Sequence, residues 1–416
     1  MKLEFNTIDE IFQTILRNKT RSILTAFGIF WGIFMLVLLM GGGLGLQRLL
    51  YMNFEGFASN SAFIAGDKTS KPYKGFDKGR EIVFNNGDEE IIKRNVAGLK
   101  VITPLATQFG KRPKAGKREF TESAYLKGMY PIYKEIENPS IRVGRFINDV
   151  DIRMTRKVCV LGKKVAQSLF PGVQNPCGRH LTVDGIDYQV VGVSGSMRHM
   201  SVMGPMESSI IVPFTTEQQV YHLGNKYSVL CFTGYSGESM EQLTKEVESA
   251  AKKLHYVNPN DDQAFFKINM EVMFKMVDTL FRGIRILIWL IGIGTLLAGA
   301  IGVSNIMMVT VTERTVEIGI RRAIGARPRS IMTQIMSESI VLTIIAGLFG
   351  IMLAVGILHI IETFVANSTQ MNVSFQISFI MAIGSAFFLA LLGGLAGLMP
   401  TFRALAIKPV DAMRDE

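Results

Sequence analysis

Four long apolar stretches divide this chain of 416 residues. Each contains at most one charged residue and is long enough to cross the roughly 30 Å hydrocarbon core of a bilayer as a helix. Between the first two stretches the pattern changes to short apolar runs separated by polar turns, which is typical of a water-exposed domain. We therefore predict membrane spans at residues 22–46, 285–311, 331–361 and 377–399.

The segment between the first two spans, residues 47–284, carries both strand and helix patterns. Residues 80–84 predict a short strand, and residues 88–96 predict a helix because acidic side chains occupy their first turn. Residues 180–193 predict a β-hairpin with Asp184 and Gly185 at its turn. Strands mixed with helices favour an α+β domain.

Helical patterns also flank this domain at both ends. Residues 47–57 continue the first span, and residues 270–282, which contain no glycine or proline, lead into the second span. We predict that these segments are stalk helices. A continuous helix is stiff, so movement at the membrane would be carried into the outer domain.

Composition agrees with this hybrid pattern, since 48% of the residues are hydrophobic and 19% are charged. That is too apolar for an ordinary soluble protein and too charged for a wholly embedded one. The predicted fold is a membrane protein of four transmembrane helices, with a large α+β extracytoplasmic domain inserted between helices 1 and 2. The net charge of +10 is expected to serve contact with anionic membrane lipid, and no nucleic acid is expected as a partner.

Basic residues flank the spans unevenly. Residues 1–21 contain four Lys or Arg and residues 312–330 contain five Arg, whereas residues 362–376 contain none. By the positive-inside rule, the basic segments face the cytoplasm. Both termini, including the tail at residues 400–416, are therefore predicted to be cytoplasmic.

Residues 1–21 place apolar side chains at helical spacing, with charged and amide side chains on the other side. This pattern predicts an amphipathic helix on the cytoplasmic surface of the membrane. The alternative is a plain solubilising leader. A cleavable signal peptide is not favoured, because the apolar stretch that follows is too long and lacks a cleavage pattern.

The segment between the second and third spans, residues 312–330, predicts a short helix from Thr312 to Ile324. Glu317 precedes Arg321 in the order that favours an ion pair one helical turn apart. Gly325 is expected to end the helix in a left-handed cap, and Pro328 suits the first turn of the next helix. Val316, Ile320 and Ile324 form an apolar edge for lipid or for the groove of a partner.

The string from Glu313 to Ala326, ERTVEIGIRRAIGA, resembles the signature of FtsX/MacB-type ABC transporter permeases. Gly144-Arg-Phe, Val160-Leu-Gly and Val190-Val-Gly-Val together resemble the MacB-type periplasmic core domain. The resemblance supports an outer lobe at about residues 123–215, inserted into a membrane-near module. It also makes residues 312–330 a segment that couples to a cytoplasmic ATPase, with matched positions at Glu313, Arg314, Glu317, Ile318, Gly319, Arg321, Arg322, Gly325 and Ala326.

The resemblance implies a permease subunit in the inner membrane, with its large domain in the periplasm. The expected partners are a separate ABC ATP-binding subunit, a second copy of the chain in a homodimer, a periplasmic adaptor and an outer-membrane channel. ATP and Mg would be bound by the partner ATPase, and mechanotransmission through this chain would drive efflux of a drug, peptide or similar substrate. Two alternatives stay open, namely a lipoprotein-releasing permease and a non-transport sensor or regulator of cell-wall hydrolases.

No enzyme activity is expected of this chain itself. The basic segment Gly110–Arg118 looks like a phosphate-binding loop, but it has five residues between its glycines where four are needed. The histidines show no metal-ligand spacing, so neither a metal nor a cofactor is predicted on the chain. At most one disulfide can form among Cys159, Cys177 and Cys231, and the sequence does not assign its partners.

Overall fold

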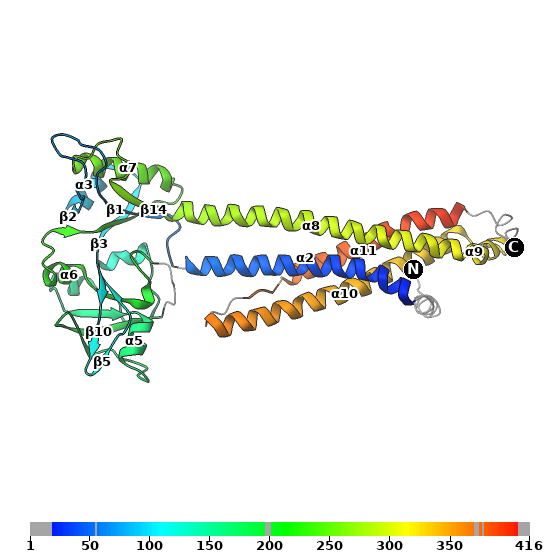
Figure 1. Cartoon of the computed structure of the whole chain (residues 1–416), viewed down its shortest axis with the longest axis horizontal. Helices are drawn as coiled ribbons and strands as arrows, with labels where there is room; N and C mark the ends of the chain where they lie inside the picture. The colour runs from blue at the N-terminus through cyan, green and yellow to red at the C-terminus, as the bar shows by residue number, and fades with distance from the viewer. Residues whose placement is uncertain (1–18, 55, 196–200, 370–373, 377, 407–416) are drawn as a thin grey trace. The chain divides into compact units, whose positions relative to one another are not determined.

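A computed structural model describes residues 19–54, 56–195, 201–369, 374–376 and 378–406. The chain divides into two compact units. Residues 50–278 form an α+β unit, and the chain before and after them forms a helical unit (Figure 1). The amphipathic helix predicted for residues 1–21 lies outside the described residues, except that its last three positions belong to the first described helix.

The helical unit is built from long apolar helices. Three of the described helices are long and apolar enough to cross a membrane, over Ala26–Met52, Met270–Glu313 and Pro328–Asn367. In the last helix the described apolar stretch covers Leu391–Leu405, so the fourth span stays a prediction. The helices are α2 (Lys19–Asn53), α8 (Met270–Glu313), α9 (Thr315–Ala323), α10 (Pro328–Thr369) and α11 (Phe379–Ala406).

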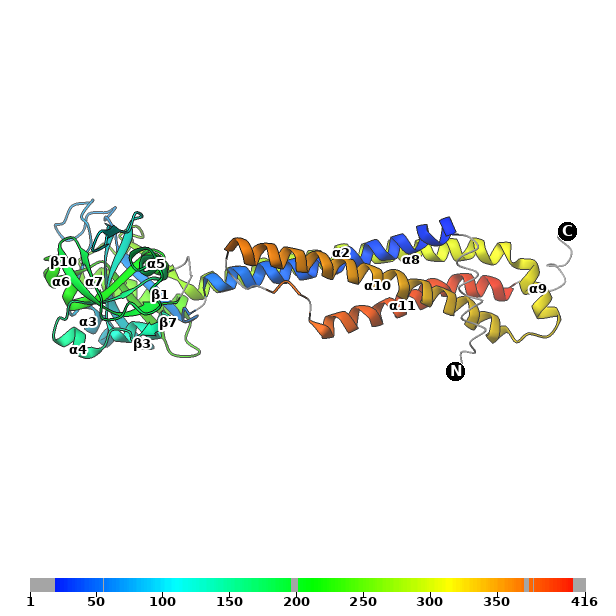
Figure 2. The same ribbon diagram turned by 90° about the horizontal axis from the view of Figure 1, so that it is seen from below.

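Helix α2 packs closely against α8 and α10 because glycines meet backbone at the contacts (Figure 2). A Cβ atom on Gly299 of α8 would lie 3.1 Å from the Gly28 carbonyl, and one on Gly350 of α10 would lie 2.8 Å from the Phe30 oxygen. Small residues allow such approach between membrane helices. We infer that these three helices form a tightly packed bundle.

The described residues of the α+β unit form fourteen strands, twelve of them in one sheet. The order is β14-β1-β13-β3-β6-β11-β8-β10-β9-β4-β5, with β7 paired to β10, and β2 pairs with β12 separately. The strands are β1 (Ser61–Gly66), β2 (Phe84–Asn85), β3 (Leu99–Lys111), β4 (Lys114–Ala115), β5 (Arg118–Glu119), β6 (Ala124–Met129), β7 (Ile141–Gly144), β8 (Val158–Leu161), β9 (His180–Val183), β10 (Ile186–Ser194), β11 (Ser209–Pro213), β12 (Lys226–Tyr227), β13 (Val229–Gly234) and β14 (Phe265–Asn269).

Strand β3 is long enough to join two lobes of this sheet. Its first half pairs with β13, where Leu105 faces Val229, and its second half pairs with β6, where Ala106 faces Gly128. Short helices cover the sheet around these strands. They are α3 (Asp88–Asn95), α4 (Asp149–Arg153), α5 (Lys163–Leu169), α6 (Phe214–Val220) and α7 (Met240–Leu254), with 3-10 turns at Pro131–Glu135 and Met206–Ser208.

Separate clusters of buried side chains fill the two lobes. One lobe is centred on Ile64 and Phe232 with α3 and α7, and the other on Leu126 and Leu161 with α5. The second cluster also includes Phe120. The hairpin of β4 and β5 therefore packs with this lobe, which the sequence predicted to start at about residue 123. All three cysteines are free thiols.

Local sequence explains several of these elements. The β9–β10 hairpin turns through Asp184 and Gly185 with φ values of 51° and 81°, as the predicted turn requires. Ser239 caps α7 by accepting a hydrogen bond from the Gln242 amide. Only the end of the strand predicted at residues 80–84 forms a strand, since Phe84 belongs to β2. Arg80 and Ile82 bond instead to the loop residues Thr69 and Asp67, so Glu81 makes only an isolated bridge with Lys68.

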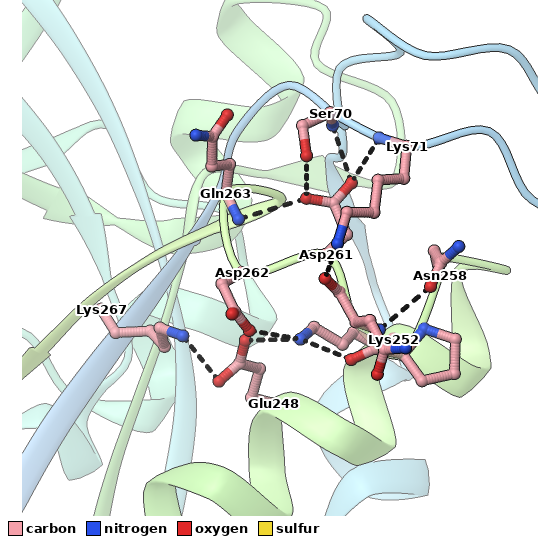
Figure 3. A network of polar contacts seen from close by, with 11 residues as sticks. Ser70, Lys71, Glu248, Lys252, Asn258, Asp261, Asp262, Gln263 and Lys267 are labelled. Atoms are coloured by element: carbon pink, nitrogen blue, oxygen red, sulfur yellow. Dashed lines mark hydrogen bonds and ion pairs between the residues drawn. The ribbon is translucent and has the colours of Figure 1, made fainter.

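A buried aspartate ties together the loops that precede β2 and β14 (Figure 3). Asp261 is fully buried and accepts hydrogen bonds from the Ser70 amide and hydroxyl at 2.7 Å and from the Lys71 amide at 3.0 Å. Burial alone would raise the pKa of Asp261, but these hydrogen bonds hold it below its ordinary value. The Asp261 carboxylate is therefore ionised and links the two loops through fixed hydrogen bonds.

Glu217 on α6 is a different kind of buried carboxyl group. Among the described residues neither of its oxygens has a hydrogen-bond partner, and the side chain packs against Gly128 of β6. Burial raises the pKa of Glu217 to about 8. The group is therefore neutral in the folded chain at neutral pH, although it is ionised there in the unfolded chain.

This difference predicts a pH-dependent stability. Between about pH 4.5 and pH 8 the folded chain holds a proton that the unfolded chain has released, so the free energy of unfolding falls as pH rises. We expect Glu217→Gln to raise that free energy by about 2–4 kcal/mol at pH 8.5 and to change it little near pH 4.5. Urea-dependent proteolysis of the full chain in detergent measures this effect. Glu246→Gln, at an exposed position, is the matched control, and an equal gain at both pH values would contradict the assignment.

Candidate functional site

The candidate site is the short helix α9 between α8 and α10. The sequence predicted one helix from Thr312 to Ile324, but α8 continues to Glu313 and α9 starts only at Thr315. Arg314 separates them with φ −96° and ψ 13°. The chain changes direction at this residue, and α9 lies against α10.

The far end of α9 is as the sequence predicted. Gly325 adopts a left-handed conformation with φ +99°, and α10 begins at Pro328. The Ala326 amide closes the turn by donating to the Arg321 carbonyl at 3.0 Å. The helix is therefore separately terminated at both ends.

Three arginines fasten α9 to its neighbours. Arg314 Nη1 lies 3.2 Å from Glu338 Oε1 of α10, and Arg321 Nη1 donates to Gln334 Oε1 at 3.0 Å. Arg322 Nη1 donates to the Leu405 carbonyl of α11 at 2.9 Å. These contacts link one short helix to two long ones.

Apolar packing on the same side completes the attachment. Ile318 is buried in a cluster with Val311, Ile331, Ile335 and Ala404, and Gly319 beside it is buried too. The predicted ion pair between Glu317 and Arg321 forms at 2.9 Å, and both side chains stay partly exposed. The inner face of α9 thus combines ion pairs with buried aliphatic contacts.

The outer face of α9 carries the apolar edge that the sequence predicted. Val316 and Ile320 are each 45% exposed, and Ile324 is 83% exposed. The three side chains follow one another at intervals of one helical turn. Such a line on a helix outside the predicted spans is a surface that a partner can cover.

The nine predicted site residues therefore separate by role. Ile318 and Gly319 face inward, and Arg314, Arg321 and Arg322 attach the helix to α10 and α11, while Gly325 and Ala326 end it. Glu313 ends α8 and is exposed, and Glu317 pairs with Arg321. The sequence reasoning missed Gln334 and Glu338, although Glu338 is the one acidic residue in the predicted span 331–361, and a charge within an apolar run is a recognised signal.

The side chains at this site contact one another across α9, α10 and α11. Its groups are guanidinium, carboxylate, amide and aliphatic side chains that already bond to one another. Within the described parts of the chain, no group of three or more His, Cys, Asp or Glu side chains gathers as a metal site requires. What the arrangement offers is a firm attachment on one side and an exposed edge on the other.

Comparison with known proteins identifies two family models along the chain. The MacB-like periplasmic core domain matches residues 22–250, and the FtsX-like permease C-terminal domain matches residues 289–409. The first model alone covers more than half of the chain. The second includes all of α9.

Curated relatives match nearly the whole chain. It is 28% identical over 408 residues to a macrolide export ATP-binding/permease protein MacB from Bdellovibrio bacteriovorus, covering 97% of this chain and 61% of that protein. MacB from Chlorobium phaeobacteroides is 30% identical, with 98% and 60% covered. The pyoverdine export ATP-binding/permease protein PvdT from Pseudomonas fluorescens is 28% identical, with 96% and 58% covered. The chain therefore spans about 60% of the length of these relatives.

Solved structures of two outer domains are also similar to this chain. The periplasmic region of MacB from Actinobacillus actinomycetemcomitans is 19% identical with a TM-score of 0.43, over 54% of this chain and 96% of that one. The extracellular domain of the transporter YknZ from Gram-positive bacteria is 18% identical with a TM-score of 0.41, over 50% and 100%.

The family matches confirm the resemblance that the motifs predicted. They also agree with the apolar helices and the α+β unit of the structure. The protein is an inner-membrane protein with a periplasmic domain. The chain belongs to the MacB-like, FtsX-type family of ABC transporter permeases.

Proposed function

We propose that this chain is the permease subunit of an export complex whose ATP is hydrolysed by a separate ATP-binding subunit. The curated relatives are named as ATP-binding/permease proteins, and this chain aligns with about 60% of their length. Both matched domains belong to the permease part. ATP and Mg would bind to the partner, and this chain would carry the resulting movement.

The observation that carries the proposal is the two-sided character of α9. Its inner face is fastened to α10 and α11 through Arg314, Arg321 and Arg322, and its outer face exposes Val316, Ile320 and Ile324. A subunit docked on the outer edge would displace α9. Because the inner contacts are charged, hydrogen-bonded and buried in part, α10 and α11 would move with it.

The proposal extends to the rest of the assembly. We place both termini and α9 in the cytoplasm, as the distribution of basic residues favours. Two copies of the chain would form a homodimer, and a periplasmic adaptor and an outer-membrane channel would complete the route. The names of the relatives, macrolide export and pyoverdine export, support export of a small organic molecule.

The two alternative functions predict different sets of partner proteins. A lipoprotein-releasing permease would keep the ATP-binding partner and lack an exit channel. A membrane-anchored sensor or regulator would transport nothing. Identification of the proteins that remain bound to the purified chain separates these assemblies.

The docking edge makes a first prediction for this function. Replacing Ile320 and Ile324 together by glutamate places two charges where an apolar contact is proposed, so binding of the ATP-binding subunit should fall by about tenfold or more. The measurement is co-purification from native membranes, with mass spectrometry and an ATPase assay of the eluate.

The matched control is the pair Ile91→Glu and Ile132→Glu, at positions 42% and 47% exposed in the α+β unit. It should retain the ATP-binding subunit in full. If neither the wild type nor the control retains a protein that hydrolyses ATP, the transporter proposal fails and the sensor alternative leads.

The inner attachment makes a second prediction. Glu338→Gln keeps the shape of the side chain but removes the charge that holds Arg314. The complex should therefore still assemble, but less movement should pass from α9 to α10. We expect the nucleotide-dependent change in hydrogen exchange of the α+β unit to fall by about half or more, with binding of the ATP-binding subunit unchanged. Glu362→Gln on the same helix is the control. An unchanged nucleotide response in Glu338→Gln would show that this ion pair does not transmit movement.

A further inference from the structure

An apolar pocket opens in the α+β unit, formed by residues that the proposed function does not use. Its volume is about 70 Å³. Nine of its ten lining residues are apolar, and the remaining one is Ser201. A polar ligand loses its hydrogen bonds to water when it enters a pocket, and one hydroxyl with no charged lining residue cannot replace them. The pocket therefore favours an apolar group.

The pocket arises from one small residue in a row of large ones. Ala65 of β1 faces Val229 of β13 on one side and Phe266 of β14 on the other. In the next row on the same face of the sheet, Phe63 lies opposite Cys231 and Ile268. Ala65 therefore leaves a gap where its neighbours project far from the sheet, and the gap is the floor of the pocket.

Residues Ser201, Val202 and Met203 line the other side of the pocket, and a buried lysine holds this segment in place. Lys127 of β6 is fully buried, and its Nζ donates to Ser201 Oγ at 3.0 Å and to the Gly204 carbonyl at 2.6 Å. Burial lowers the pKa of Lys127 to about 8. Burying an ammonium group costs free energy. The two hydrogen bonds from Lys127 therefore indicate that the position of this segment is important.

Backbone strain in the same segment also indicates that its position is important. Met203 adopts a φ of +57°, which is rare for a residue with a side chain. Gly204 follows with φ +103° and lies so close to the ring of Tyr125 that a larger residue would clash. Strain of this kind persists where the surrounding structure requires one conformation, and it gathers at binding sites.

The mouth of the pocket is open and adaptable. Met203 and Phe266 line it and remain 42% and 58% exposed. Methionine is flexible and polarisable, so it adjusts to the shape of an apolar ligand. A ligand that enters here can leave its polar part in solvent.

We propose that this pocket binds the end of an unbranched alkyl chain that belongs to a single-chain amphiphile. The pocket is smaller than the cavities of about 150 Å³ that accept benzene, so a narrow chain fits better than an aromatic ring. The absence of any charged or amide side chain among its lining residues leaves the headgroup outside. This inference does not depend on docking of an ATP-binding subunit.

The test uses the full chain in phospholipid nanodiscs and decanoic acid that carries a diazirine within its chain. After illumination, mass spectrometry maps the labelled peptides. We expect adducts on the peptides that contain residues 201–204 and 265–270, and excess unlabelled decanoic acid should remove them. Adducts confined to the membrane helices would overturn the proposal.

Two variants make the test specific. Ala65→Phe fills the floor and should reduce these adducts by about tenfold, whereas Ala97→Phe, at an exposed position, should leave them unchanged. If Ala65→Phe does not fold, Met203→Glu places a carboxylate at the mouth and should have the same effect, with the exposed Met154→Glu as its control. Equal labelling in the variant and its control, or displacement by an apolar pentapeptide but not by decanoic acid, would refute alkyl-chain binding.

Discussion

The contact between Arg314 and Glu338 is the constraint on which the proposed mechanism depends. Glu338 is 5% exposed and lies within the long apolar helix α10, where an unpaired carboxylate would be costly. The arginine that satisfies it stands at the break between α8 and α9. The same ion pair therefore satisfies a buried charge and fixes the position of α9. Displacing α9 without moving α10 would break this ion pair.

The two units use buried polar groups for similar purposes. Asp261 holds two loops of the α+β unit together, and Lys127 holds the segment beside the apolar pocket. In the helical unit, close glycine contacts between α2, α8 and α10 leave little freedom for the helices to slide. Helix α8 runs from Met270 to Glu313 without interruption.

Much of this architecture was readable from local patterns. The hairpin at Asp184-Gly185, the helix that starts at Asp88 and the left-handed Gly325 each follow from residues within a few positions. The break at Arg314 and its partner Glu338 did not, because they depend on a contact 24 positions away in the sequence. The pocket was equally hidden, since the gap at Ala65 exists only when β13 and β14 are paired beside β1. Local propensity therefore predicted the elements, and long-range pairing determined the sites.

The most direct test of the account is a charge exchange between Arg314 and Glu338. Arg314→Glu and Glu338→Arg would be made singly and together, and the nucleotide-driven movement of the α+β unit would be measured by distance changes between spin labels. The account predicts that each single variant binds the ATP-binding subunit but loses most of the movement, and that the exchanged pair recovers a large part of it. An exchanged pair that assembles normally and moves no more than the single variants would contradict transmission through this contact.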